Sequence, residues 1–434
     1  MIISPIAISP HRPSGKLLST YWTQLLSTIG YEHPMLPGLW LQKEGGVWKI
    51  KSHTIDDFRK TIATPIVKYV DAVNGLDTNN GDTAGTAYKT VTKLMTVTWD
   101  RAYLAEGNYA FTSHVFSGRD HEVIGSGRVT LTRGYLGSEV VWTDAGGGVF
   151  TTPLTAMQMV FENAVDDANG DPVALTKAAS AVAAAATPGT WYWHADEDVL
   201  YVHRSDGSTP NTSDITINYA GSGGFTEYTY MEGVIFLGSF GTGNATATNF
   251  KYLLKNCRRI AIPSGAGDSS GNIWMWFEDC VFARTGTGDL NNIKASGGYT
   301  PALVEVNCKM YDAGKTYPTT THIANTSSTH NSVVTLRVNG EYYESEGVVV
   351  HDVNAAISLN VGCHAHDSVS GDDTHKACFG TAAQAAETSK VYLYDCTTSG
   401  DGYGVVNLSP LTAHIYAHGG TIHSVEAGTT LEAF

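Results

Sequence analysis

The fold is decided by residues 304–311, which read Val304-Glu305-Val306-Asn307-Cys308-Lys309-Met310-Tyr311. The stretch belongs to a set of short strand-like segments after residue 250, each with a small residue at an equivalent position. Those small residues are Cys257, Cys280, Cys308, Gly340, Cys363 and Cys396. Their spacings are 23, 28, 32, 23 and 33 residues, and a period of 20–50 residues is typical of stacked repeat proteins. Because no helical pattern separates the segments, the repeat predicts an all-β chain folded as a right-handed parallel β-helix.

Alternation along the same stretch predicts which side chains point inward. Side chains alternate between the two faces of a strand, which places Val304, Val306, Cys308 and Met310 on one face and Glu305, Asn307 and Lys309 on the other. We therefore expect the cysteines to line the interior as free thiols, because unpaired cysteine packs as a small apolar residue.

The histidines beside Cys363 are candidates for a metal site. In a strand, His364 and His366 lie on the face opposite Cys363, and zinc sites normally use closely paired ligands. We therefore predict no metal site, and no motif indicates a cofactor.

Composition and charge exclude several classes of protein. The 434 residues include 46 glycines, and 27 basic against 42 acidic residues give a net charge of -15. Nucleic-acid binding needs a basic surface, so we expect no nucleic-acid partner. No run reaches the roughly 18 apolar residues of a membrane span, and the start lacks the pattern of a signal peptide. We expect neither membrane insertion nor signal-directed export.

The charge also divides the chain into two parts. Residues 1–60 hold seven basic and four acidic residues, a balance of +3, which leaves -18 for the rest. We predict an N-terminal attachment module over 1–65 and a β-helix body over 66–434. Within the body, residues 140–220 depart from the repeat: an alanine-rich run at 178–186 predicts a short helix, and Trp191 to His203 predicts a β-hairpin with an acidic turn.

Two segments carry a resemblance to a known family. The stretch Tyr69-Val70-Asp71-Ala72-Val73-Asn74-Gly75, continuing to Val91, resembles the capped opening of right-handed parallel β-helix proteins. Its Asp/Asn/Gly loop is typical either of a backbone turn or of a calcium-binding loop. The hairpin beginning Pro188-Gly189-Thr190-Trp191-Tyr192 is similar to hairpins inserted in polysaccharide-associated β-helix proteins.

Together with the repeats, these segments make the chain resemble a bacteriophage tailspike or tail-fibre protein with a pectate-lyase-like body. The resemblance implies a homotrimer in the virion tail, made in the host cytoplasm without a signal peptide. Its N-terminus would dock to other tail proteins, and its body would bind host cell-surface polysaccharide and in some members cleave it. No family catalytic motif transfers to this chain.

The candidate site residues come from a concentration of histidines and carboxylates after residue 320. As catalytic candidates we predict His330, His351, Asp352, Asp372 and Asp373. As glycan-binding candidates we predict Trp191, Trp193, Arg337, His366 and Lys376. Carboxylate pairs serve glycoside hydrolysis, whereas histidine or lysine can abstract a proton in a lyase reaction; the same residues are also common in turns and on polar surfaces.

Three functions stay open at this point. We predict that the chain is a virion protein that binds a glycan, with or without cleaving it. The alternatives are a secreted polysaccharide lyase or glycoside hydrolase and a purely structural virion component. The acidic balance favours a neutral or amino sugar over a polyuronate, because like charges repel.

Overall fold

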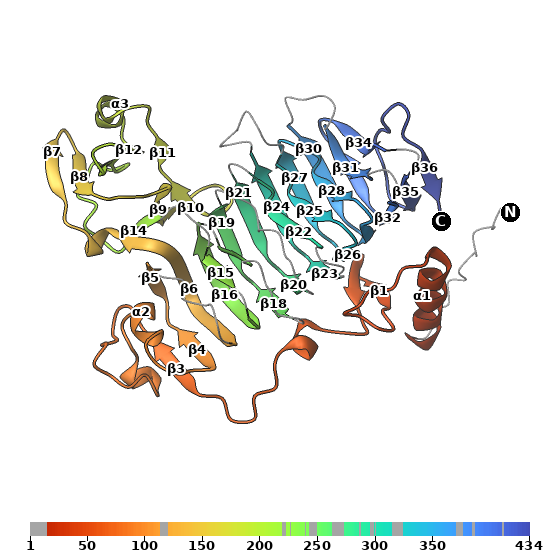
Figure 1. The fold of residues 1–434 in the computed structure, drawn as a ribbon, viewed down its shortest axis with the longest axis horizontal. Coiled ribbons are helices and arrows are strands. Elements are labelled where there is room, and N and C mark those ends of the chain that lie inside the picture. Colours follow the sequence, from red (N-terminus) through yellow and green to blue (C-terminus); the bar gives the residue numbers. More distant parts are fainter. Residues whose placement is uncertain are drawn as a thin grey trace.

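The computed structural model describes residues 15–112, 120–218, 223–225, 227–238, 240–242, 250–262, 273–285, 288–295, 299, 301–314, 324–369, 376–383, 387–409 and 412–434. The body is a coil of parallel strands stacked along one axis, with an antiparallel region at one end (Figure 1). This arrangement confirms the predicted all-β parallel β-helix. No helix in the described ranges has the length and apolar character needed to cross a membrane.

Three parallel sheets form the walls of the coil. Sheet 1 contains β3 (Val67–Val70), β4 (Arg101–Leu104), the first part of β6 (His121–Leu136), the first part of β16 (Thr229–Leu237), β18 (Phe250–Lys255), β20 (Ile273–Glu278), β23 (Ala302–Val306), β26 (Val334–Val338), β29 (Ile357–Val361), β32 (Ser389–Tyr394), β35 (Ala413–His418) and β36 (Leu431–Ala433). Sheet 2 contains β5 (Gly107–Phe111), the later parts of β6 and β16, β19 (Arg258–Ile262), β21 (Val281–Thr285), β24 (Lys309–Ala313), β27 (Glu341–Ser345), β30 (His364–Ser368) and β33 (Thr397–Ser399). Sheet 3 contains β22 (Asn291–Lys294), β25 (Ser327–His330), β28 (Val350–Val353), β31 (Ala377–Ala382) and β34 (Tyr403–Asn407).

Each predicted repeat segment is two strands joined by a sharp corner, not one strand. Asn307 separates β23 from β24 and has a left-handed backbone with φ 52°. Asn, Asp and Gly tolerate this conformation, and residues of these types hold the equivalent corners at 256, 279, 339, 362 and 395. The corner side chains also bond along the stack, since the Asn307 Nδ2 donates to Asp279 Oδ1 at 2.9 Å.

The corner makes part of the predicted face assignment wrong. A left-handed residue breaks the two-residue alternation, so the strand before it and the strand after it use opposite parity. Cys308 and Met310 do face the interior, but Val304 and Val306 pack on the outer side of sheet 1, and Glu305 is fully buried inside.

The prediction for the cysteines is confirmed. All six are free and buried in the main interior cluster, and five of them directly follow a corner residue. Burial raises the pKa of Cys257 and Cys280 well above the usual value. Gly340 replaces cysteine in one rung because an added Cβ would collide with the ring of Tyr342, which fills that space.

The N-terminal segment lies across the outer face of sheet 1. It contains α1 (Gly15–Ile29), β1 (Leu41–Glu44), β2 (Val47–Ile50) and the 3-10 helix η1 (Ile55–Phe58). Its apolar side chains, Trp22 among them, pack against Val304, Leu336 and Val338. Basic residues of this segment pair with acidic residues of the body: Lys43 with Asp395 at 3.0 Å and Arg59 with Glu122 at 3.0 Å. In the described part, residues 15–60 therefore cover the body; their role in attachment stays a prediction.

A loop and a short helix close the first rung. Helix α2 (Val91–Leu94) buries Val91 and Leu94 over the interior, and the Thr90 side chain caps it by accepting from the Lys93 amide. A second short element, η2 (Ala84–Thr86), precedes it. Asp77 accepts hydrogen bonds from the backbone amides of residues 89 and 90, at 3.0 and 2.9 Å. The Asp77 carboxylate therefore forms hydrogen bonds within the turn, as expected if the Asp/Asn/Gly loop serves as a turn.

The inserted region is largely antiparallel, as the hairpin prediction requires. β12 (Thr190–His194) pairs with β13 (Val199–His203), and α3 (Ala181–Ala186) precedes them, so both predicted elements are confirmed. The sheet continues through β7 (Thr143–Gly146), β8 (Val149–Pro153) and β11 (Thr176–Lys177). β9 (Met159–Asp166), β10 (Pro172–Ala174) and β14 (Ile215–Asn218) join this region to β6. A short parallel pair, β15 (Gly223–Phe225) and β17 (Phe240–Thr242), follows, and η3 (Gly137–Glu139) ends β6.

Candidate functional site

Two predicted site residues lie in the interior of the coil. Arg337 and Asp352 are both 0% exposed, and the guanidinium bonds both carboxylate oxygens of Asp352 at 2.8 and 2.9 Å. Burial alone would raise the pKa of Asp352, but the Arg337 guanidinium outweighs it and holds that pKa below its usual range. The catalytic prediction for Asp352 and the glycan-binding prediction for Arg337 are therefore wrong, because neither can touch a glycan.

The pair belongs to a buried polar network that spans all three sheets. Glu305 lies 3.2 Å from Arg337 Nε and accepts from the Tyr342 hydroxyl at 2.8 Å and from Asn291 Nδ2 at 2.7 Å. Buried charges persist when they are paired and hydrogen-bonded in this way. The network positions β23, β26 and β28 and has a structural role.

Two predicted histidines do come together. His330 ends β25 and His351 follows in β28; because Ser328 is paired with His351, the two histidines are diagonal neighbours on the outer face of sheet 3. The Ser328 hydroxyl bonds His330 Nε2 at 2.7 Å. Lys376 directly precedes β31 of the same sheet. Asp372 and Asp373 lie outside the described residues, so their catalytic role stays a prediction.

The two predicted tryptophans hold the hairpin to the inserted region. Trp191 is 3% exposed and donates its indole N–H to the Leu175 carbonyl at 3.0 Å. This burial makes its predicted glycan contact wrong. Trp193 is partly buried, packs against the same cluster and donates to the Leu154 carbonyl at 2.9 Å. His366, on the outer face of β30, stacks on Tyr343 with ring centroids 4.7 Å apart.

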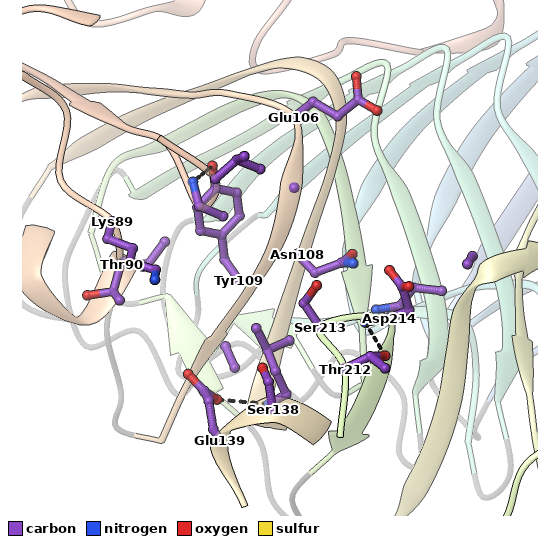
Figure 2. A pocket seen from close by; sticks show the side chains of 18 of the residues that line it. Lys89, Thr90, Glu106, Asn108, Tyr109, Ser138, Glu139, Thr212, Ser213 and Asp214 are labelled. Atoms are coloured by element: carbon purple, nitrogen blue, oxygen red, sulfur yellow. Dashed lines mark hydrogen bonds between the residues drawn. The ribbon is translucent and has the colours of Figure 1, made fainter. Parts of the chain in front are cut away.

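A cleft of about 940 Å³ lies between the first rungs and the root of the inserted region. One wall is the capping loop with α2 and β5, and the other is η3 with the loop at residues 211–214 that leads into β14. Figure 2 shows side chains from both walls directed into the space between them. A cleft of this size is within the range of small-ligand sites.

Several polar side chains of the cleft lack a hydrogen-bond partner among the described residues. Within that part of the chain, seven polar lining residues make no side-chain hydrogen bond: Lys89, Glu106, Asn108, Ser138, Asn211, Ser213 and Asp214. In Figure 2, Asn108 on β5 points toward Ser213 and Asp214 on the opposite loop. The cleft therefore offers carboxylate, amide and hydroxyl groups to a ligand, which is the set that hydrogen-bonds sugar hydroxyls.

Two other charged groups of the cleft, Arg128 and Glu139, are already engaged. Arg128 bonds both carboxylate oxygens of Asp166, at 2.8 and 2.6 Å. Glu139 accepts the amide of Leu136 at 2.8 Å and so ends β6. Lys89 is the remaining base among the lining residues. A cleft with unengaged carboxylates and little spare positive charge suits a neutral or cationic ligand better than an anionic one.

Sequence reasoning missed this cleft. Asn108 and Asp214 are more than 100 residues apart, and neither lies in a repeat segment or a motif. The one local signal is the run Asn211-Thr212-Ser213-Asp214, a polar cluster that predicts a loop and does not indicate its neighbours. The predicted histidines His330, His351 and His366 lie on sheets 2 and 3, and none of them lines this cleft.

Comparisons with known proteins give only distant likenesses. No family model matches the chain, and no curated protein matches it significantly. Among solved structures, the complex of XylC with xylose shares 11% identity over 84% of this chain and 76% of that chain, with a TM-score of 0.47. A glycoside hydrolase shares 11% identity over 82% and 96%, with a TM-score of 0.45. The Gp54 tailspike of Acinetobacter baumannii bacteriophage AP22, in complex with A. baumannii capsular saccharide, shares 9% identity over 77% and 74%, with a TM-score of 0.15. At these identities and TM-scores, nothing follows from the likenesses about what this chain binds or cleaves.

Proposed function

We propose that the protein binds a neutral or amino-sugar polysaccharide in the cleft between β5 and the loop at residues 211–214. The observation that supports this proposal is the set of unengaged polar side chains on facing walls, with Asn108 on one side and Ser213 and Asp214 on the other. A sugar presents many hydroxyl groups, each able to donate and accept a hydrogen bond. A wall of mixed amide, hydroxyl and carboxylate groups matches that pattern.

Charge narrows the class of sugar. The body carries -18, and Arg128 is taken up by Asp166. A polyuronate would meet Glu106 and Asp214 without a free arginine to pair its carboxylates. A neutral sugar meets no such repulsion, and an amino sugar adds attraction to Asp214.

Direct binding measurements test the proposal. Extracted capsule and lipopolysaccharide, alongside neutral, amino-sugar and uronate oligosaccharides, are titrated into the full chain by calorimetry. Asn108→Ala removes one neutral hydrogen bond and should weaken binding by about 0.5–1.5 kcal/mol, roughly two- to twelve-fold in Kd, whereas Asp214→Asn should cost about 1.5–3 kcal/mol. Glu197→Gln, at an exposed hairpin turn with the side chain 61% exposed, is the matched control and should bind as the wild type. Equal affinity in all four proteins would refute the cleft as the site, and no binding of any glycan favours the purely structural alternative.

A second candidate function is cleavage of the bound glycan. The observation that favours it is that two unengaged carboxylates, Glu106 and Asp214, line one cleft. Glycoside hydrolysis uses two carboxyl groups, one as the acid and the other as base or nucleophile. The test is release of reducing ends from the bound polysaccharide. Loss of release in both Glu106→Gln and Asp214→Asn with binding retained in Glu106→Gln supports hydrolysis, and unsaturated products absorbing in the ultraviolet would instead indicate a lyase.

We also propose, from the sequence resemblance, that the chain is a homotrimeric component of a phage tail whose N-terminal residues dock to other tail proteins. The ion pairs of residues 43 and 59 with the body show that this segment can be held against the coil in one chain. Mass measurement in solution distinguishes a trimer from the monomer expected of a free-standing enzyme. Antibody labelling of virions, read by electron microscopy, tests the location; an unlabelled tail contradicts it.

A further inference from the structure

Sheet 2 carries a ladder of polar side chains on its outer face that the proposed function does not use. β24, β27 and β30 pair in parallel and lie side by side (Figure 1). Their register aligns Lys309, Glu341 and His364 in one column. Tyr311, Tyr343 and His366 form the next column, with Tyr311 and Tyr343 stacked at 5.1 Å.

Two histidines and a carboxylate converge in this ladder. His364 and His366 are two residues apart on β30, so both project outward while Ala365 between them is buried. Their rings lie 4.5 Å apart, and Glu341 reaches them from β27. One ligand atom from each of the three residues falls within 4.8 Å of the other two.

The hydrogen bonds of His366 prepare one nitrogen for a ligand. Its Nδ1 bonds the Asp367 carboxylate at 2.7 Å. A carboxylate accepts and cannot donate, so Nδ1 carries the proton and Nε2 of the neutral ring keeps its lone pair. Nε2 is buried and has no hydrogen-bond partner in the part of the chain that the structure describes, and it stands 3.7 Å from Glu341 Oε1. A metal-binding imidazole commonly donates its other ring N–H to a carboxylate in this way.

From this geometry we propose that Glu341, His364 and His366 bind a divalent transition-metal ion of the zinc class. Two imidazoles and one carboxylate are a ligand set that zinc accepts, with a further position left to solvent. Ligand atoms around a tetrahedral zinc stand about 3.3 Å apart, so the 3.7 Å from His366 Nε2 to Glu341 Oε1 is close to the required spacing. The ion would join β27 to β30, and the inference is independent of the proposed glycan binding.

The ammonium group of Lys309 would compete with the metal ion for the Glu341 carboxylate, so a variant of Lys309 gives a specific test of the site. Its ammonium group lies 3.6 Å from Glu341 Oε2, while Oε1 faces His366. A fixed positive charge beside a ligand opposes a second cation. Removing that charge should therefore strengthen metal binding, an effect that general loss of structure cannot produce.

The experiment is a metal titration of the full chain after chelator treatment. Zn²⁺ is titrated against a competing indicator, and Co²⁺ is followed by its visible absorption. The wild type should bind one ion per chain at this site, His366→Gln and Glu341→Gln should weaken that binding at least tenfold, and Lys309→Met should tighten it. His414→Gln is the matched control, because His414 also pairs with a glutamate, Glu432, at 2.8 Å but belongs to no three-residue cluster in the described chain.

The unfolding temperature distinguishes binding at this site from binding to other surface histidines. A ligand that binds only the folded state raises the unfolding temperature, so Zn²⁺ should stabilise the wild type and Lys309→Met but not His366→Gln. Mg²⁺ prefers oxygen ligands and should have no effect. Equal zinc affinity in the wild type and His366→Gln, or weaker binding in Lys309→Met than in the wild type, would overturn the proposal.

Discussion

Replacing Arg337 with methionine tests whether the buried network holds the coil together. Arg337 donates two bonds to Asp352, one to Glu305 at 3.2 Å and one to Ser327 at 3.0 Å, and all of these side chains are 0% exposed. Methionine fills much of the same volume but leaves two carboxylates buried without a cation. Breaking a buried pair in this way costs about 3–5 kcal/mol, whereas an exposed pair contributes about 1 kcal/mol or less.

The assay is urea unfolding followed by tryptophan fluorescence, with Lys49→Met as the exposed control. Lys49 pairs with Glu44 at 3.2 Å, but its side chain is 54% exposed, so this variant should lose about 1 kcal/mol at most. A loss in Arg337→Met no larger than that of the control would refute a central role for the network. Arg337→Met combined with Asp352→Asn should recover part of the loss, because it removes one of the uncompensated charges.

The pH dependence gives the same prediction an independent check. In the wild type the pKa of Asp352 is held below its usual value, so its contribution to stability is present at neutral pH and is lost as pH falls through that low pKa. In Arg337→Met, burial without the cation raises the pKa of this carboxyl group, so the folded state is weakened as pH rises above about 4. The deficit should therefore be largest at pH 7 and shrink toward pH 4, and a deficit that grows on acidification would contradict the reasoning.

Three further predictions concern other parts of the chain. Gly340→Ala should destabilise by about 1–3 kcal/mol because its Cβ meets the Tyr342 ring, whereas Gly85→Ala, with nothing nearer than 3.9 Å, should cost nothing measurable in thermal unfolding. Burial lowers the pKa of His33 to about 4, so above pH 6.5 the ring is neutral in both states and has no pH-dependent effect on stability. As pH falls from 6.5 to 4 the unfolded state alone takes up the proton, which should destabilise the fold by about 3 kcal/mol. Unfolding of His33→Gln across that window should show a flatter pH dependence, and an unchanged slope would count against it. The six buried cysteines should react with a thiol reagent only after unfolding, and stoichiometric labelling of any one in the native protein would disprove their inward packing.

The repeat and the interior cysteines were predictable because they rest on local rules. A small residue recurring every 20–50 residues with strand-forming neighbours indicates stacked rungs whatever the details of packing. The alanine run and the hairpin at Trp191 to His203 were predictable for the same reason. The capping loop was predicted from the resemblance of residues 69–91 to the opening of other parallel β-helix proteins.

The faces of the strands were only partly predictable. Simple alternation holds within a strand, and Asn307 ends it with a left-handed turn. An Asn, Asp or Gly directly precedes each of the recurring small residues. If that residue is taken as a corner, the alternation predicts that Glu305 faces the interior and Val304 faces outward. It would also have shown Arg337 to face the interior, since it pairs in register with Glu305.

By itself, the sequence determined the class of fold, the stacking of the rungs, the inward ladder of thiols and the two elements of the inserted region, because each depends on neighbours along the chain. Only the tertiary structure decided that residues 15–60 lie across sheet 1, that Arg337 and Asp352 are buried, and that Asn108 faces Asp214 in a cleft. Those contacts join residues up to several hundred positions apart. Parallel stacking brings such residues within reach through the register of whole sheets, and no local pattern records which positions will meet.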